Sequence, residues 1–281
     1  MAGVRVVTDS SSDLLDETLT ELGIGMVPLR IRFGDEELVD REELSTKEFW
    51  VRCAASPVLP STAAPAPGQF QAAFEAMAEE GADGVVCVNL SSKMSATIES
   101  ARQAGRSLEG RLAVQVVDSR SVTLGLGLIV AEAARAASAG ADLEAVVAVA
   151  EDASSRMKLY GAIDTLENLK KGGRIGGARA LLGSMLSIKP VVEVRDGLVE
   201  EELKQRTRSR SLRYLADRAR AAGPLSRFAV FSADAPDLDQ FQTLLDGVGP
   251  IEGTTLYGDV GPVIGTHAGP GAIGVAWIPA S

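Results

Sequence analysis

The alternation of helix-like and strand-like segments between residues 70 and 139 is the feature of this sequence that most constrains its fold. The pattern predicts helices at 70–79, 95–108 and 124–139, and strands at 84–90 and 112–118. Strands that alternate with helices pair in parallel, because each helix crosses back over the sheet. An apolar run at 4–8, followed by Asp9 and three serines, predicts one more strand and then a helix capped by a hydroxyl residue. We therefore expect an α/β protein whose N-terminal sheet is mostly parallel and flanked by helices.

Smaller elements are predicted between the first strand and this alternating region. Gly23 is expected to end the first helix, and residues 26–33 alternate as a strand with Pro28 near its start. Ser45-Thr-Lys-Glu48 is a capping-box pattern, which predicts the start of a helix. A proline-rich connection at 56–68 then leads into the alternating region.

The pattern changes after a helix that is predicted at 143–158. Apolar runs on both sides of Asp196-Gly197 resemble a β-hairpin, because Asp-Gly favours its tight turn. The remaining segments predict helices at 209–222 and 238–245, and strands at 228–232, 251–257 and 272–278. We expect residues 1–158 to form the α/β domain and residues 159–281 to form a smaller α+β domain.

Composition and charge exclude several classes of protein. The 281 residues carry 28 Lys and Arg against 38 Asp and Glu, a net charge of −10, so no sequence-wide basic field attracts nucleic acid. Cys53, Cys87 and His267 are too few and too widely spaced for a metal cluster, so we expect no metal and two reduced cysteines. Asp9 interrupts any signal peptide, and glycines and prolines interrupt the uncharged stretch 261–281. We therefore expect a cytoplasmic protein without a membrane helix.

Hydroxyl side chains gather where three predicted strands end. They lie in the segments 8–12, 89–95 and 118–121, and Ser61 and Thr62 precede a predicted helix. The carboxyl ends of parallel strands share one edge of a sheet, where ligands bind, and hydroxyl groups there can hold an oxyanion. The alternative is that each serine caps a helix. The sequence leaves both interpretations open.

Two segments concentrate basic residues in this acidic chain. Residues 169–177 combine bases with glycines, which fits either a phosphate-binding loop or the C-terminus of a helix that stops at Gly172. Arg174 lies between two glycine pairs, so we expect it to be exposed as a contact for a partner. Residues 204–210 fit the solvated start of a helix, in which Arg206 or Lys204 could instead turn inward and balance a bound carboxylate.

Residues 258–271 are too rich in glycine for a helix and too apolar for an ordinary surface loop. We expect a loop that approaches a ligand or a neighbouring loop closely. The segment contains His267, the only histidine, through which any Ser-His-Asp triad has to pass. No Gly-x-Ser-x-Gly elbow accompanies it, which favours a structural role or a polar contact to a ligand over catalysis.

Seven segments together resemble the DegV family of bacterial fatty-acid-binding proteins. They occur in the order expected for the family and cover nearly the whole chain. The segments are Thr8-Asp-Ser-Ser-Ser-Asp-Leu14, Val27-Pro-Leu29, Thr62-Ala-Ala-Pro-Ala-Pro-Gly68, Leu90-Ser-Ser-Lys-Met-Ser-Ala-Thr97, Val117-Asp-Ser-Arg-Ser121, Leu169-Lys-Lys-Gly-Gly-Arg-Ile175 and Gly261-Pro-Val-Ile-Gly-Thr-His-Ala-Gly-Pro-Gly271. The family usually has Thr-Ser-Gln-Pro where this chain has Thr62-Ala63-Ala64-Pro65, so one hydroxyl and one amide near the expected head group are absent.

The resemblance implies a two-domain α/β protein that holds one long-chain fatty acid in an apolar tunnel at the domain interface. It implies that the fatty-acid carboxylate contacts six residues: Thr62, Ser91, Ser92, Ser95, Arg206 and His267. It also implies a carrier without catalytic residues, a cofactor or an ATP site, which presents the carboxylate to a fatty acid kinase and then carries the acyl-phosphate. Arg174 would face that kinase, and transient contact with a membrane would allow lipid exchange.

Two other functions remain compatible with the residues. A hydrolase or kinase-like transferase could use a serine of the segment 91–95 with His267 and either Asp9 or Asp118. A structural interaction protein would use the same motifs as helix caps, and side chains would fill the junction between its domains.

Overall fold

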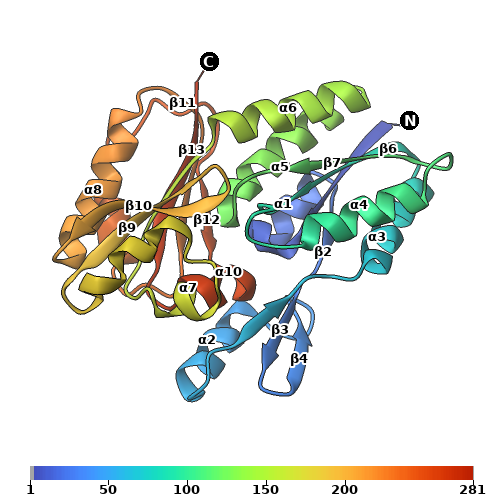
Figure 1. Cartoon of the computed structure of the whole chain (residues 1–281). Coiled ribbons are helices and arrows are strands. Elements are labelled where there is room, and N and C mark those ends of the chain that lie inside the picture. The colour runs from blue at the N-terminus through green and yellow to red at the C-terminus, as the bar shows by residue number, and fades with distance from the viewer. Residues whose placement is uncertain (1–2, 281) are drawn as a thin grey trace.

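The computed structural model describes residues 3–280, and within residues 182–187 it describes the backbone alone. The chain forms a parallel sheet of four strands, a mixed sheet of six strands and a small antiparallel sheet of three strands (Figure 1). Helices pack on both larger sheets, which confirms the predicted α/β class. None of the described helices has the length and hydrophobicity that a membrane span requires.

The N-terminal sheet has the strand order β2-β1-β6-β7, and every neighbouring pair is parallel, as predicted. Its strands are β1 (Gly3–Asp9), β2 (Ile24–Val27), β6 (Ala82–Asn89) and β7 (Ala113–Asp118). One face is covered by α3 (Pro67–Glu79) and α4 (Thr97–Ser107), and the other by α5 (Thr123–Ser138) and α6 (Leu143–Arg156) (Figure 1). Val85 and Cys87 of β6 pack in the α3 and α4 layer, whereas Val86 and Val88 pack in the α5 layer. Both faces are therefore buried, which explains the continuous apolar run of this strand.

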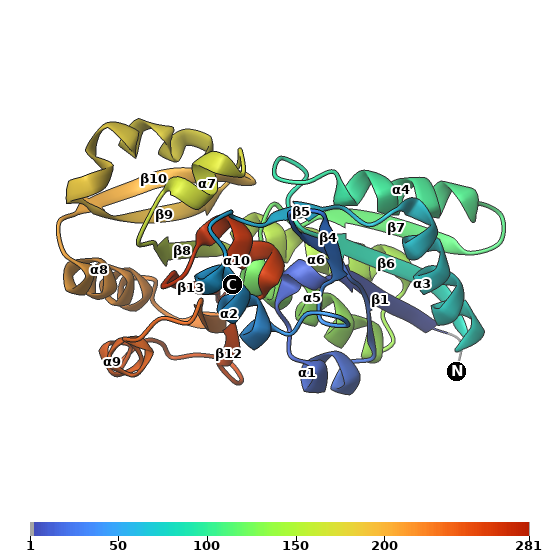
Figure 2. The same ribbon diagram turned by 90° about the horizontal axis from the view of Figure 1, so that it is seen from below.

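The C-terminal sheet is mixed and has the strand order β10-β9-β8-β13-β11-β12. Its strands are β8 (Lys158–Ala162), β9 (Lys189–Arg195), β10 (Leu198–Gln205), β11 (Leu225–Ser232), β12 (Leu256–Asp259) and β13 (Ile273–Pro279). Helices α8 (Arg208–Ala221) and α9 (Leu238–Leu244) lie on its outer side (Figure 2). β9 and β10 form the hairpin that was predicted around Asp196-Gly197. β8 begins at Lys158, the last residue of the predicted N-terminal domain. The helix predicted at 143–158 is α6, which ends at Arg156, two residues earlier than predicted.

A small antiparallel sheet extends away from the two large ones (Figure 1). It consists of β3 (Arg30–Phe33), β4 (Glu36–Val39) and β5 (Ser61–Ala63), and α2 (Thr46–Ala55) packs beside it. The prediction of one strand over 26–33 is wrong, because the chain changes sheets at Pro28. Pro28 has no N–H to donate to a strand pair, and the N–H of Leu29 donates to Ser10 Oγ (3.1 Å) rather than to a strand.

Ser61 and Thr62 precede a helix, as predicted, but they also form β5 and pair with β3. This pairing gives Thr62 a fixed position next to the two large sheets. The helix predicted after Ser45 is confirmed as α2, since Ser45 Oγ accepts the N–H of Glu48 (3.2 Å).

The turn after β1 differs from the predicted hydroxyl-capped helix. β1 leads into a 3-10 helix, η1 (Ser10–Ser12), and Asp9 caps it by accepting the N–H of Ser11 (3.1 Å). The cap is therefore a carboxylate, and α1 (Asp16–Glu21) follows as a separate helix. Gly23 follows α1 with a φ of +61°, which confirms that glycine ends the helix.

The segment 258–271 contains a helix, α10 (Pro262–Ala268), so the prediction that it is too rich in glycine for a helix is wrong. Pro262 occupies the first helical position, where its fixed φ suits a helix and its missing N–H is not needed. Gly265 lies inside the helix, and a Cβ there would be 2.8 Å from Cζ2 of Trp50. The glycine therefore allows close packing of α10 against α2.

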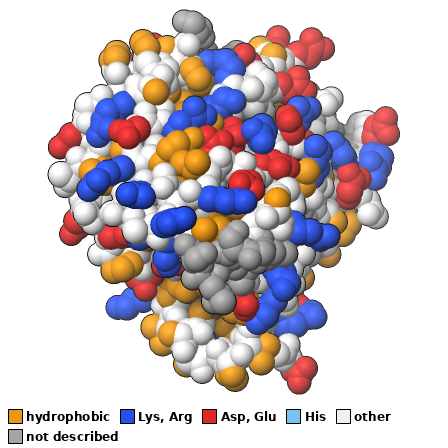
Figure 3. Space-filling model, turned by 60° about the vertical axis from the view of Figure 1, so that its left-hand side comes forward, with side chains coloured by type: hydrophobic (Ala, Val, Ile, Leu, Met, Phe, Trp, Pro, Cys, Tyr) orange, Lys and Arg blue, Asp and Glu red, His pale blue; other side chains and the backbone are white. Residues whose placement is uncertain are grey.

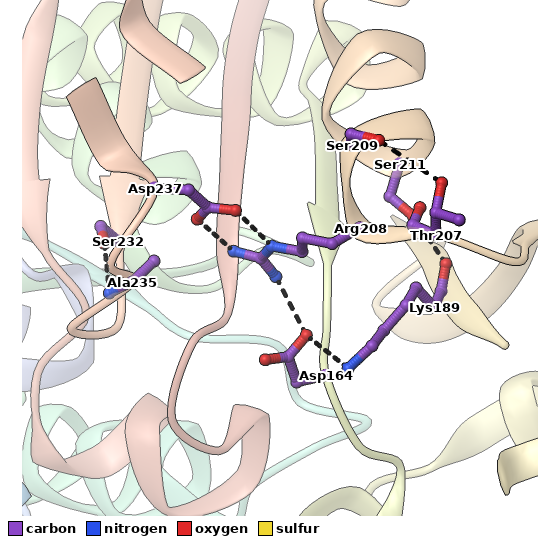
Figure 4. A network of polar contacts seen from close by, with 9 residues as sticks. All are labelled: Asp164, Lys189, Thr207, Arg208, Ser209, Ser211, Ser232, Ala235 and Asp237. Atoms are coloured by element: carbon purple, nitrogen blue, oxygen red, sulfur yellow. Dashed lines mark hydrogen bonds and ion pairs between the residues drawn. The ribbon is translucent and has the colours of Figure 1, made fainter. Parts of the chain in front are cut away.

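A network of ion pairs ties together the ends of β8, β9 and α8 (Figure 4). Arg208 donates from Nε and Nη2 to the two carboxylate oxygens of Asp237 (2.9 and 3.0 Å). Asp164, which follows β8, accepts hydrogen bonds from Arg208 Nη1 (3.4 Å) and Lys189 Nζ (3.1 Å). Paired guanidinium and carboxylate groups restrict one another's geometry. The network thus anchors the exit of β8, from which the chain continues into α7 (Glu167–Lys171) and η2 (Gly176–Ser187).

Helix α5 is buried along most of its length and joins the two large sheets. It packs against β1 and β6 of the N-terminal sheet and against β11 and β13 of the C-terminal sheet. Gly127 allows this close approach, because a Cβ there would lie 2.8 Å from Ser12 O and 3.0 Å from Leu14 Cδ2. One hydrophobic cluster therefore extends from one sheet to the other through α5.

We predict that Gly127→Ala lowers the free energy of unfolding by about 1–3 kcal/mol, because the added methyl meets a backbone carbonyl that has no room to move. The matched control is Gly68→Ala in α3, where no heavy atom lies within 4 Å of the added Cβ. Gly68→Ala should raise the free energy of unfolding by up to about 1 kcal/mol through helix propensity. Urea unfolding measures both changes, and equal effects would contradict the close packing of α5.

Candidate functional site

A cavity with mostly apolar walls, the central pocket, lies between the two large sheets. It encloses about 880 Å³ of space between atoms, part of which is open to solvent. The C-terminal sheet supplies one wall, whose side chains are Leu159, Val192, Val194, Val199, Phe231 and Ile273. Leu29, Leu90 and Val122, from loops at the carboxyl ends of the parallel strands, supply another. The junction is therefore hollow, unlike that of the structural protein considered from the sequence.

Four polar residues on the lining form a polar rim: Thr62, Ser95, Arg174 and His267. Thr62 Oγ1 and His267 Nε2 are 3.0 Å apart. Arg174 Nε donates to the carbonyl of Met94, the neighbour of Ser95 (3.0 Å). Figure 2 shows α10, which carries His267, near the centre of the molecule, between the two large sheets. Segments that are distant in the sequence thus place their polar groups at one edge of an apolar pocket.

The imidazole of His267 is neutral at pH 7. Burial, and to a lesser degree the positive charge of Arg174, lowers the pKa of His267 to about 4. Its Nδ1 is buried and has no hydrogen-bond partner within residues 3–280. Gly172 packs against this side of the ring, because a Cβ on Gly172 would overlap Nδ1. A neutral ring with a free nitrogen can donate a hydrogen bond to a ligand or accept one from it.

Arg174 connects the end of α7 to the loop after β6. α7 ends with Gly172 as its C-cap, which confirms the interpretation of 169–177 as a helix C-terminus rather than a phosphate-binding loop. Arg174 Nη1 donates to the carbonyl of Gly172 (2.6 Å), while Nε reaches Met94. The guanidinium is thereby held beside the polar rim, and the residue is exposed, as predicted.

A second hollow, the mouth groove, adjoins the central pocket at the polar rim. Both share Thr62, Arg174 and His267 as lining residues. The loop 57–60 forms one side of the mouth groove, and there Val58 is 64% exposed. The polar rim is therefore within reach of solvent and of a partner through this groove.

Three of the predicted head-group residues lie outside the lining of the central pocket. Ser91 Oγ donates to the carbonyl of Gly197 (2.6 Å) and so links the loop after β6 to the β9–β10 turn. Ser92 Oγ donates to Asp118 Oδ2 (2.5 Å). Arg206 is exposed before α8. Figure 3 shows one face of the molecule, on which basic side chains are interspersed with acidic ones. The other three predicted residues belong to the polar rim.

Met94 and Thr123 are among the lining residues that sequence reasoning did not name as site residues. Met94 and Thr123 both face the central pocket, and Thr123 is the first residue of α5. Thr123 has a left-handed φ of 46°, and its Oγ1 has no hydrogen-bond partner in the described part of the chain. Its position directly after the hydroxyl-rich segment 118–121, at the carboxyl end of β7, is the signal that could have identified it.

Two buried carboxyl groups lie below α10 beside η1. Burial raises the pKa of Asp13 to about 8 and that of Asp40 to about 6. Asp13 Oδ1 is close to Gly261, since a Cβ on Gly261 would lie 2.6 Å from it. Asp13 is therefore mostly neutral at pH 7 and supports the start of the helix that carries His267.

The residues of the alternative enzyme do not assemble into a catalytic triad. Asp9 accepts hydrogen bonds from Asn89 Nδ2 and from the N–H of Leu90 (both 3.0 Å), and Asp118 accepts from Ser92. Within residues 3–280, the hydrogen bond of the His267 ring is to Thr62, and no carboxylate bonds to its Nδ1. The orientation of an imidazole by a carboxylate, on which triad chemistry depends, is therefore absent from this part of the chain.

The fold and the site together define an α/β protein with two large sheets that enclose an apolar pocket with a polar rim. A family model described as "Uncharacterised protein, DegV family" matches residues 3–280. The chain belongs to the DegV family.

Relatives match this chain over almost its full length. A DegV domain-containing protein of Deinococcus radiodurans is 37% identical over 294 residues, which is 99% of each chain. One from Streptomyces coelicolor is 35% identical over 280 residues, which is 97% of each chain. A fatty acid binding DegV family protein from Thermus thermophilus has a TM-score of 0.90 and 32% identity, over 99% of this chain and 100% of that one. DegV of Bacillus subtilis, a fatty acid binding protein, has a TM-score of 0.86 and 29% identity over 100% of both chains.

We predict that His267 titrates at about pH 4 in the folded protein. A histidine in the unfolded chain titrates at about 6.5, so between these pH values the unfolded state binds more protons. The stability that the neutral ring contributes is therefore complete above about pH 6.5 and is lost as the pH falls towards 4. His267→Gln should remove this dependence, which amounts to about 2 kcal/mol between about pH 7 and 4.5.

The measurement is an NMR titration of the imidazole Cε1–H in protein that has been freed of any bound ligand, and its assignment is unambiguous because the chain has one histidine. Urea unfolding of the wild type and of His267→Gln at both pH values gives the stability difference. A titration midpoint at about 6.5 in the folded protein would contradict the buried, neutral ring.

Proposed function

We propose that this protein binds one long-chain fatty acid in the central pocket, with the acyl chain along the apolar walls and the carboxylate at the polar rim. The observation that carries the proposal is the contact between Thr62 and His267 at the edge of an otherwise apolar cavity between the sheets. The similar structures from Thermus thermophilus and Bacillus subtilis are of fatty acid binding proteins, which supports this ligand class.

The acyl chain supplies most of the binding free energy in this proposal. Each methylene removed from water contributes about 0.8 kcal/mol, so about fifteen of them contribute on the order of 12 kcal/mol before the costs of association. Aliphatic side chains such as Val192, Val199 and Ile273 provide the apolar contacts for the chain. The walls thus determine affinity more than the rim does.

The carboxylate needs hydrogen-bond donors at the rim, because burial of an unpaired carboxylate is unfavourable by several kcal/mol. The neutral ring of His267 and the hydroxyl of Thr62 have one proton each, and their mutual hydrogen bond uses one of the two. The pair can therefore donate one hydrogen bond to the carboxylate, either from Thr62 Oγ1 or from His267 Nδ1. A bound carboxylate favours the protonated ring. We therefore expect ligand binding to raise the pKa of His267 from its value of about 4.

Mass spectrometry of the purified, gently denatured protein tests the proposed ligand. We expect a long-chain fatty acid in a ratio of about one per chain, since one central pocket holds one acyl chain. Delipidated protein should take up an added fatty acid, which should shift the His267 resonance, whereas the corresponding methyl ester should not. Repeated absence of a bound acid, together with no uptake of added acids, would refute the proposal.

We predict that Thr62→Val weakens binding of the fatty acid about fivefold, because one hydrogen bond of about 1 kcal/mol is lost while the β-branched shape is kept. Binding of the methyl ester should stay the same, since the acyl chain still fills the pocket. The matched control is Thr20→Val on the exposed side of α1, far from the lining. Titration calorimetry with both ligands measures the effect, and equal losses in the two variants would reject the assigned role of Thr62.

We further propose that a fatty acid kinase phosphorylates the carboxylate through the mouth groove, and that the protein then carries the acyl-phosphate. Support comes from access, since the mouth groove reaches Thr62, Arg174 and His267 from outside. Val58 and Leu59 are exposed on this groove (64% and 36%), which suits transient contact with the kinase, or with a membrane during lipid exchange.

We predict that Arg174→Ala changes fatty-acid affinity by less than about twofold but slows kinase-dependent phosphorylation by about tenfold, because a charged contact with the kinase is lost. Lys170→Ala, which removes an exposed charge of α7 outside the groove lining, is the control. Calorimetry gives the affinity, and a coupled assay with the kinase gives the rate. Parallel losses of binding and transfer would place Arg174 in the lipid site alone.

A further inference from the structure

A polar hollow, the rear hollow, adjoins the central pocket at a different place from the mouth groove. It encloses about 490 Å³ of space between atoms, and it lies where the loop after β7, the end of α6, the start of β8 and the β9–β10 turn meet. Val194 lines both the rear hollow and the central pocket. Among the described lining residues, the rear hollow and the mouth groove have none in common. Val194 therefore separates the apolar pocket from a second polar space.

Three cationic residues from segments distant in the sequence line the rear hollow: Arg120, Lys158 and Arg195. Two carboxylates, Glu193 and Asp196, oppose them. Glu193 Oε2 is paired with Arg195 Nη1 (3.1 Å), so the charge of this buried carboxylate is already compensated. Three positive and two negative charges leave an excess of one positive charge, in a chain whose net charge is −10.

Two hydroxyl groups on the same lining have no partner. Ser121 Oγ and Ser154 Oγ are buried, and neither makes a hydrogen bond within the described part of the chain. Ser121 is 2% exposed, so solvent does not satisfy it freely. Buried hydroxyls are almost always hydrogen-bonded in folded proteins. Each of these two groups therefore keeps a free proton at the lining of the rear hollow.

The backbone holds Arg120 beside the rear hollow. Its N–H donates to Asp118 Oδ1 (2.9 Å), and its φ of +52° lies in the left-handed region. The β9–β10 turn packs against it, since a Cβ on Gly197 would lie 3.6 Å from Arg120 Cα. Ser91 fixes this turn through its hydrogen bond to the Gly197 carbonyl (2.6 Å). The backbone of Arg120 is therefore fixed at the edge of the rear hollow, and its exposed side chain is attached there.

We infer that the rear hollow is a binding site for a small oxyanion, either a carboxylate or a phosphate. Such anions accept hydrogen bonds from guanidinium, ammonium and hydroxyl groups, and the charged donors among these make the stronger hydrogen bonds. The anion is either free in solution or the far end of an acyl ligand that carries a second carboxylate and passes Val194. Binding of a free anion does not depend on the proposed function. Binding of the far end of an acyl ligand rests on the proposed function, because it requires an acyl chain in the central pocket.

Inorganic phosphate is the first probe, added to the delipidated full-length chain. We expect saturable NMR shifts of the Arg120 and Ser121 amides, with an affinity at least about fivefold weaker in the double variant Lys158→Gln and Arg195→Gln. Lys158→Gln alone is the fallback, because the exposed side chain of Lys158 has no hydrogen bond or ion pair within residues 3–280 that the substitution would break. Arg213→Gln, an exposed charge of α8 outside the hollow, is the control and should leave the affinity unchanged.

Hexadecanedioate, compared with hexadecanoate, is the second probe and distinguishes the two sources. If the anion is the far end of an acyl ligand, the diacid should bind more tightly than hexadecanoate. Val194→Ala should increase this difference in affinity, and the double variant should abolish it. Equal affinities of the two acids, with phosphate bound through the same cations, identify a free anion. The inference is overturned if neither phosphate nor the diacid depends on Lys158 and Arg195. Binding of hexadecanoate in that case would still support the proposed function.

Discussion

The packing of α5 between the two large sheets is the constraint on which the central pocket depends. α5 contacts strands of both sheets. A Cβ on Gly125 would overlap Leu159 Cδ1 of the C-terminal sheet, and a Cβ on Gly127 would overlap the carbonyl oxygen of Ser12 in η1. At its first turn, Val122 and Thr123 line the central pocket, and no later described residue of α5 does so. The sheets are therefore held together along the helix, and the cavity lies only where the helix begins.

The polar residues around this cavity divide into two groups with different physical tasks. Thr62 and His267 bond to each other across the lining and leave His267 Nδ1 without a described partner. Ser91 and Ser92 instead connect loops, one to the β9–β10 turn and the other to Asp118. Buried polar groups are stable only when they are paired, so most hydroxyls at this edge of the sheet serve the scaffold. Of the buried hydroxyls without a partner in the described residues, Thr123 Oγ1 belongs to the central pocket, Ser121 Oγ and Ser154 Oγ to the rear hollow, and Ser12 Oγ to η1.

The parts of the fold that could be predicted from the sequence are those in which local pattern and burial agree. β6 and β7, with α3 to α5, follow the alternation read between residues 70 and 139, because both faces of this sheet are covered by helices. Predictions failed where packing outweighed local preference. Pro28 divides one apparent strand between two sheets, and Gly265 lies inside α10, where Trp50 leaves no room for a larger residue. Lys158 starts β8 in place of extending α6, a change that the helical pattern does not mark.

The sequence by itself determined the class of fold, the order of the loops around the ligand edge and the presence of one histidine in a glycine-rich segment. The tertiary structure decided which side chains meet. Thr62 and His267 are 205 residues apart in the chain, and only the pairing of β5 with β3 and the packing of α10 bring them within 3.0 Å. It also decided that His267 is neutral at pH 7 and that Arg206 is exposed. The physical reason is that burial and charge at a site depend on distances between segments, and the linear order of residues does not contain those distances.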